Sequence, residues 1–178
     1  MLDNFHEEVV QKRNRAASTL LYGLAWVGVV LFGLVALMGI SSLMNGQFSV
    51  PSIVIMVISG GVAFLIWRYK DELRAEYDYT FTNGEFEAAR VLGNARRRYL
   101  TSLSVKTVEA AGLVSHNSFQ RYLSMKDVKK HNWFLNRDAE LLFMFFSKKG
   151  VKHLIIVEPS DEMVVMIKKY LPFSVWQA

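Results

Sequence analysis

Hydrophobic residues dominate one long segment near the start of the chain. Between Ala16 and Trp67 there are 52 consecutive residues without Asp, Glu, Lys, Arg or His. One crossing of the hydrocarbon core needs about 20 apolar residues, so this segment is too long for one helix and suits two. Polar residues around Asn45 interrupt it, and Pro51 favours the first turn of a second helix. The pattern predicts a two-helix transmembrane hairpin over residues 16–69, with spans at about 19–43 and 51–69.

The residues after this segment change to the period-two alternation of half-buried strands. Polar and apolar types alternate strictly over residues 77–82, and Asn83-Gly84 suits the two positive φ angles of a type I′ turn. Alternation resumes at Glu85, which predicts a β-hairpin. A second hairpin is predicted from the apolar residues 140–146, the turn at 147–150 and the return at 151–158. A further strand is expected at 131–136.

Two helices are predicted outside the hairpin. Residues 160–171 have a capping Ser160, acidic residues at the start, an apolar stripe and a stop at Pro172. Residues 1–15 are interpreted as a cytoplasmic helix, because Asp3 and Asn4 suit a helix start and Phe5 and Val9 are four residues apart. The fold class is therefore α+β. A transmembrane α-hairpin precedes a β-rich domain at 70–178, with about six or seven antiparallel strands and one amphipathic C-terminal helix.

The distribution of basic residues predicts the orientation in the membrane. Lys12, Arg13 and Arg15 precede the first span, Arg68 and Lys70 follow the second, and the connecting loop has no basic residue. Lys and Arg favour the cytoplasmic side, so both termini are expected there. Aromatic and basic residues at the same depth are expected to anchor the hairpin at the interface: Tyr22, Trp26, Trp67, Arg68, Tyr69 and Lys70. Glycines in both spans predict close packing within the hairpin, with homo-oligomer formation as the alternative.

The net charge of +5 belongs to the residues from Arg68 onward, because residues 1–15 contain three acidic and three basic residues. Three clusters supply candidate contacts to anionic lipid or to a partner: Arg96, Arg97 and Arg98; Lys129 and Lys130; Lys148 and Lys149. Each basic residue near an anionic leaflet contributes about 1 kcal/mol of attraction. The alternative is an ordinary solvated basic face. Nucleic-acid binding is not expected, because the aromatic residues fit core positions better than stacking positions.

No catalytic, cofactor or metal site is expected from the residue pattern. The chain has no cysteine, which excludes disulfides, thiolate metal sites and a cysteine nucleophile. The four histidines show no helical ligand spacing, and phosphate-binding glycine motifs are missing from the sequence. Glu85 and Glu87 share one strand face, but they flank a turn and are interpreted as solvated charges.

The order of strands followed by a helix resembles pleckstrin-homology-like domains. The membrane hairpin, Tyr79-Thr80-Phe81-Thr82-Asn83-Gly84-Glu85, the arginines at 96–98 and Val157-Glu158-Pro159-Ser160 together resemble a family of small bacterial membrane proteins of unknown function. The resemblance implies a two-span protein of the bacterial cytoplasmic membrane and contributes no catalytic residue.

These observations favour a membrane-anchored, non-enzymatic interaction or scaffold module. Its cytoplasmic domain would bind a protein partner or the anionic inner leaflet. One alternative is an accessory subunit of a larger, transporter-like membrane complex. A second alternative is an enzyme whose site has no recognisable motif.

Overall fold

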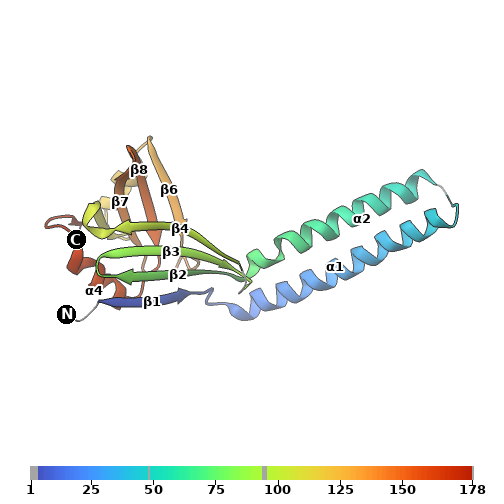
Figure 1. Cartoon of the computed structure of the whole chain (residues 1–178), viewed down its shortest axis with the longest axis horizontal. Coiled ribbons are helices and arrows are strands. Elements are labelled where there is room, and N and C mark those ends of the chain that lie inside the picture. The colour runs from blue at the N-terminus through green and yellow to red at the C-terminus, as the bar shows by residue number, and fades with distance from the viewer. Residues whose placement is uncertain (1–3, 48, 94–95, 178) are drawn as a thin grey trace. The chain divides into compact units, whose positions relative to one another are not determined.

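The computed structural model describes residues 4–47, 49–93 and 96–177 (Figure 1). The chain folds into two compact units. The helical unit contains residues 14–75 together with Leu92 and Gly93, and the β unit contains the described residues of 1–13, 76–91 and 95–178. The β unit therefore takes residues from both sides of the helical hairpin in the sequence.

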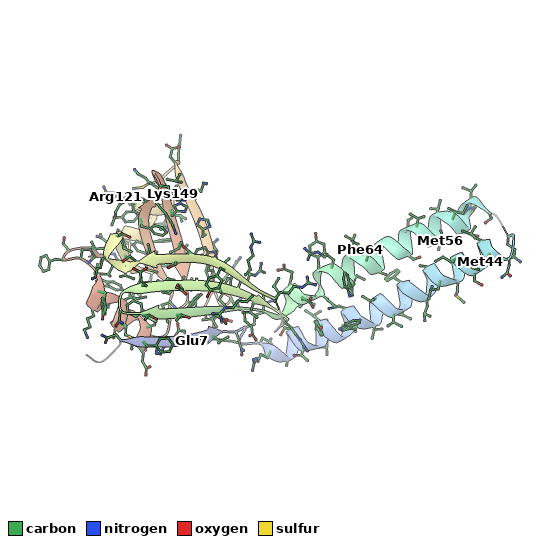
Figure 2. All side chains as sticks on the ribbon, viewed as in Figure 1. Glu7, Met44, Met56, Phe64, Arg121 and Lys149 are labelled. Carbon is green, nitrogen blue, oxygen red and sulfur yellow. The ribbon has the colours of Figure 1, made fainter. Side chains whose placement is uncertain are left out.

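The helical unit is a hairpin of α1 (Arg15–Met44) and α2 (Val50–Tyr69), followed by the short 3-10 helix η1 (Lys70–Arg74). Asn14 caps α1 by accepting a hydrogen bond from the Ala17 amide, and Ser49 caps α2 in the same way from Ser52. Both helices are long enough and apolar enough to cross a membrane. Apolar side chains surround both of them (Figure 2), and α1 buries no residue.

Two of the predicted packing glycines lie against the opposite helix. A Cβ added at Gly39 would lie 2.7 Å from Met56 Cβ, and one at Gly28 would lie 3.3 Å from Ile66 Cδ1. Glycine lets the two helices approach closely at these positions. Gly23, Gly33 and Gly61 have open space instead, since nothing lies within 4 Å of a Cβ added there.

The first sheet of the β unit has four strands in the order β1-β2-β3-β4. These are β1 (Phe5–Val10), β2 (Ala75–Thr82), β3 (Glu85–Leu92) and β4 (Arg96–Ser104). The predicted hairpin between β2 and β3 is confirmed, because Asn83 and Gly84 have φ angles of 50° and 98°. Tyr79, Phe81 and Phe86 are fully buried on its inner face.

The prediction of a helix at residues 1–15 is wrong. Residues 5–10 form β1, which pairs antiparallel with β2 from Phe5↔Thr82 to Val10↔Tyr77. Phe5 and Val9 do share a face, but residues four apart share a face in a strand as well as in a helix. Pairing with the free edge of β2 decides between the two and overrides the helix-start residues, as tertiary contacts commonly do.

The second sheet has five strands in the order β6-β8-β7-β5-β9. They are β5 (Val108–Leu113), β6 (Val128–Trp133), β7 (Leu142–Lys148), β8 (Val151–Val157) and β9 (Trp176–Gln177). The predicted hairpin of β7 and β8 is confirmed. Two pairings correct the all-antiparallel expectation: β6 lies parallel to β8, and β9 lies parallel to β5. The strand expected at 131–136 begins earlier, at Val128, because its partner is β8 and not its sequence neighbour β7.

Strand β7 separates two layers of core. Leu142, Met144 and Phe146 face the main cluster, whereas Phe143 and Phe145 face a smaller cluster with Phe119 of α3 (Ser118–Leu123). This explains why the sequence of β7 is apolar on both faces. The second 3-10 helix, η2 (Val105–Thr107), connects β4 to β5.

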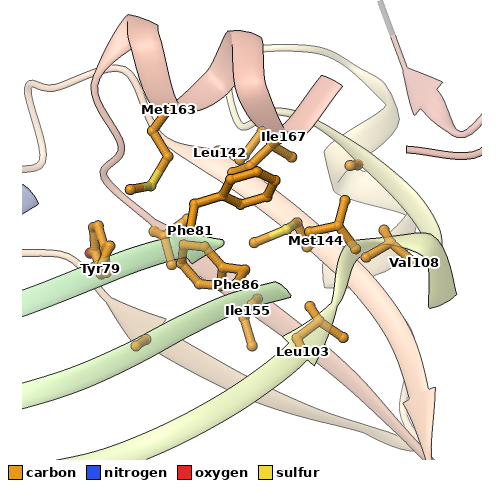
Figure 3. Close-up of a cluster of buried hydrophobic side chains, with 14 of the residues drawn as sticks. Tyr79, Phe81, Phe86, Leu103, Val108, Leu142, Met144, Ile155, Met163 and Ile167 are labelled. Atoms are coloured by element: carbon orange, nitrogen blue, oxygen red, sulfur yellow. The ribbon is translucent and has the colours of Figure 1, made fainter. Parts of the chain in front are cut away.

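The C-terminal helix α4 (Asp161–Tyr170) covers the main cluster (Figure 3). As predicted, the Ser160 side chain caps it by accepting a hydrogen bond from the Met163 amide. Met163 and Ile167 are fully buried beside Phe81 and Met144. Full burial of such a side chain stabilises a fold by about 1.5–3 kcal/mol, so α4 is an integral part of the β unit.

Candidate functional site

Three of the predicted basic residues lie at the start of β4. Arg96, Arg97 and Arg98 are exposed, and we call them the β4 arginines. Arg97 Nε lies 3.6 Å from Asp78 Oδ2, and its guanidinium lies 5.7 Å from the ring centroid of the exposed Tyr99. Burial raises the pKa of Asp78, and the positive charge of Arg97 opposes that shift. Strand β4 is the edge of its sheet, so these cations lie along an unpaired strand edge.

The predicted lysines gather at one end of the second sheet. Strands β6 and β8 run parallel and begin at this end, and β7 ends there, with Val128 opposite Lys152 and Lys148 opposite Val151. We call the exposed lysines there the lysine end, which consists of Lys129, Lys130, Lys148, Lys149 and Lys152. The five lysines come from two segments that are distant in sequence, residues 129–130 and residues 148–152. The predicted clusters at 129–130 and 148–149 therefore belong to one surface.

The β4 arginines form a separate group from the lysine end. The only described hydrogen bond from a lysine of that end to β4 is from Lys148 Nζ to the Ser102 carbonyl oxygen, at 3.1 Å. Arg98 is four residues before Ser102, which is about 13 Å along an extended strand. The β unit thus presents two basic areas at opposite ends of β4.

A pair of histidines borders the lysine end. His131 Nε2 lies 3.2 Å from His153 Nδ1, and His153 stacks on Phe146 with centroids 5.4 Å apart. Burial lowers the pKa of both imidazoles, and Lys129 lowers both further. The sequence pattern did not predict this pair, because the two histidines have no helical ligand spacing and meet across the parallel strands β6 and β8.

The predicted interface anchors form a cation–π cluster in the helical unit. Lys70 Nζ lies 4.8 Å from the ring centroid of Trp26 and 5.5 Å from that of Tyr22, and Arg74 lies 3.9 Å from Tyr22. These contacts join the start of α1 to the end of α2. Trp67, Arg68 and Tyr69 are exposed at the same end of the hairpin. Such an aromatic and basic girdle is typical of a membrane–water interface.

A second polar site, which the sequence did not predict, holds the segment before α1. The buried Asn136 accepts a hydrogen bond from the Arg13 amide and donates to the Gln11 carbonyl oxygen. The Glu158 carboxylate accepts from Asn136 Nδ2 and from the amides of Leu135 and Asn136. A cleft of about 450 Å³ lies beside this network. The Glu158 carboxylate already accepts three hydrogen bonds from the protein. The network therefore fixes residues 11–13 to the rest of the β unit.

Within the described part of the chain, no group of three or more His, Cys, Asp or Glu residues could hold a metal ion. Glu85 and Glu87 lie on β3, as the sequence analysis expected. No curated protein matches the chain. A family model described as a bacterial PH-like domain (DUF6106) matches residues 2–177. The match covers the helical hairpin as well as both sheets and α4, and the chain belongs to this bacterial PH-like domain family.

Proposed function

We propose that this protein is a membrane-anchored, non-enzymatic binding module of the bacterial cytoplasmic membrane. Its hairpin spans the membrane twice with both termini in the cytoplasm, and the β4 arginines contact anionic headgroups of the inner leaflet. The family supports a binding role, because PH-like domains are typically not enzymes. The exposed apolar side chains along both helices of the hairpin support the anchor, since a soluble helix has a polar face.

One observation carries the lipid contact. The β4 arginines come a few residues after Leu92 and Gly93, which belong to the helical unit. This covalent connection limits how far the arginines can lie from the helical unit. A Cβ added at Gly93 would lie 3.3 Å from Asp71 Cγ in η1, directly after the second span. Arginine binds phosphate groups through two parallel hydrogen bonds, so three exposed arginines that follow so soon after Gly93 in the chain suit lipid phosphates.

The lipid contact is tested in the full chain reconstituted in nanodiscs. The chain has no cysteine, so Tyr99→Cys places a single fluorophore beside the arginines, at a position that is 66% exposed. We expect a blue shift of its emission in discs containing phosphatidylglycerol compared with phosphatidylcholine alone, and loss of the shift at high salt. Changing all three β4 arginines to Gln should abolish it.

The matched control removes the same number of charges elsewhere in the β unit. The variant K129Q/K130Q/K152Q should keep the blue shift, because these three lysines belong to the lysine end. Equal emission in neutral and anionic discs, or an unchanged shift in the arginine variant, would contradict the proposed lipid contact.

A second candidate function is an accessory subunit of a larger membrane complex. The observation that favours it is the open space beside Gly23, Gly33 and Gly61, since small residues on a helix surface permit close approach by another helix. Crosslinking in native membranes should then give a larger species that disappears in Gly33→Leu, and its mass would distinguish a second copy from another protein. A chain that crosslinks only within itself would contradict this candidate.

A further inference from the structure

A small hollow lies where the second half of β4, η2 and the turn between β7 and β8 meet. Its volume is about 290 Å³. The buried side chains of Leu103 and Phe146 line it together with six polar residues: Ser102, Ser104, Thr107, Ser147, Lys148 and Lys149. Lys149 is labelled at this end of the sheet in Figure 2. All eight residues belong to the β unit.

The polar lining can neutralise and hydrogen-bond an anion. It offers two ammonium groups and four hydroxyl groups, and none of its residues is acidic. Lys148 Nζ is already positioned by its 3.1 Å hydrogen bond to the Ser102 carbonyl oxygen, and Thr107 Oγ1 donates to the Ser104 carbonyl oxygen at 2.7 Å. An ammonium group can donate three hydrogen bonds, so Lys148 keeps further donors for a ligand.

The positive charge at this hollow has no counter-ion among the residues that the structure describes. In the described residues, neither Lys148 nor Lys149 forms an ion pair with a carboxylate, and Lys152 lies opposite Ser147. The positive charges of these lysines also act on the neighbouring imidazole, since Lys129 and Lys148 both lower the pKa of His153. Uncompensated like charges repel one another, and an incoming anion would relieve that repulsion.

The turn that carries Lys149 departs from the usual chemistry of its type. Lys149 and Gly150 have φ angles of 52° and 76°, close to the values of Asn83 and Gly84 in the other hairpin. Asn-Gly is the preferred pair for such a turn, because Asn tolerates positive φ better than a long side chain does. The same chain therefore uses Asn in one turn and a strained Lys in the other. Local rules are typically broken in this way at functional positions.

We infer that this hollow binds a phosphate monoester group. Such a group carries close to two negative charges, which two lysines match, and its terminal oxygens accept from several donors at once. The apolar base formed by Leu103 and Phe146 shields the hydrogen bonds from water. The site is distinct from the β4 arginines and does not depend on the proposed lipid contact. Its ligand is either a free phosphorylated compound or the headgroup of a lipid with a terminal phosphate.

The test uses the ¹⁵N-labelled full chain in phosphatidylcholine nanodiscs and two probes. In one arm, inorganic phosphate is titrated, and in the other the discs contain phosphatidic acid without free phosphate. We expect saturable amide shifts confined to residues 102–107 and 146–150. Saturation by inorganic phosphate alone identifies a soluble ligand, and a response to phosphatidic acid alone identifies a headgroup. Absence of saturable shifts in both arms overturns the inference.

Two variants keep the test informative about binding and folding. K148Q/K149Q should weaken phosphate binding at least about tenfold, because two charge-assisted hydrogen bonds are lost. Lys149→Asn should also weaken binding, yet raise the melting temperature, because Asn fits the turn. K129Q/K130Q is the matched control and should bind phosphate nearly as well. An unchanged affinity in K148Q/K149Q would overturn the inference, whereas failure of the proposed lipid contact would appear in the emission experiment at position 99.

Discussion

The imidazoles of His131 and His153 make the β unit sensitive to acid. Their pKa values are lowered in the folded state, mainly by burial, so the unfolded chain binds protons more readily than the folded one near pH 6. The free energy of unfolding should therefore decrease as the pH falls below about 6.5, the unfolded histidine pKa. Above that pH the two histidines no longer reduce the free energy of unfolding.

Chemical unfolding of the full chain at a series of pH values measures the effect. Replacing both histidines by Phe should flatten the profile between pH 7 and pH 5, because no proton uptake then accompanies unfolding at these positions. His116→Gln is the control, since His116 is exposed and lies outside the pair. A profile that is equally steep in the double variant would show that other groups cause the acid sensitivity.

Asn136 makes the second residue-scale prediction. Asn136→Ala removes the acceptor of the Arg13 amide and the donor to Gln11 and Glu158, which leaves buried polar groups unsatisfied. The expected cost is about 1–3 kcal/mol. Hydrogen exchange should show faster exchange of the Arg13 amide. Asn117→Ala should leave exchange at Arg13 unchanged, because the Asn117 side chain makes no capping hydrogen bond. Unaltered protection of Arg13 in N136A would refute this role.

At the scale of elements, the helical hairpin depends on close packing at Gly39. Gly39→Ala would place a methyl group 2.7 Å from Met56 Cβ, so the helices must move apart. Overpacking of this kind costs about 1–3 kcal/mol. Titration of the full chain with sodium dodecyl sulfate, followed by helical circular dichroism, should show earlier unfolding for G39A. Gly33→Ala is the matched control on the same helix, and equal midpoints for the two variants would contradict the packing.

Strand β1 makes the β unit discontinuous in sequence. A fragment of residues 70–178 lacks β1 and leaves the edge of β2 unpaired, so it should be poorly soluble or unstable. Since Val10 pairs with Tyr77, a short turn should be able to join residues 4–13 to residues 76–178. This joined chain should show a cooperative thermal transition that the fragment lacks. Identical melting of the two would mean that β1 contributes nothing to the fold.

Local pattern predicted the elements whose stability is decided locally. The Asn83-Gly84 turn and the capped helix after Ser160 are examples, because turn and cap residues act within a few positions. Strand β1 and the parallel pairing of β6 with β8 were not predicted, since each depends on a partner distant in sequence. The same distinction between local and long-range features applies to the candidate site. The basic clusters were visible as sequence runs, but their grouping into two areas and the meeting of His131 with His153 required the sheet register.

At the scale of the whole molecule, the chain combines a hairpin of two long apolar helices with a PH-like β unit that takes residues from both sides of the hairpin in the sequence. The hairpin exposes apolar side chains on all sides, and aromatic and basic residues gather at the end where η1 follows α2. A two-span topology accounts for both features. The proposed orientation has the Asn45 loop outside the cell and the β unit inside.

Labelling of single cysteines in intact cells tests this topology most directly, because the native chain has no cysteine. Asn45→Cys lies in the loop between α1 and α2, and Arg121→Cys lies on the exposed face of α3. A membrane-impermeant maleimide should label N45C in intact cells and R121C only after the membrane is opened. Labelling of R121C in intact cells, or release of the chain from membranes by alkaline carbonate, would contradict the account.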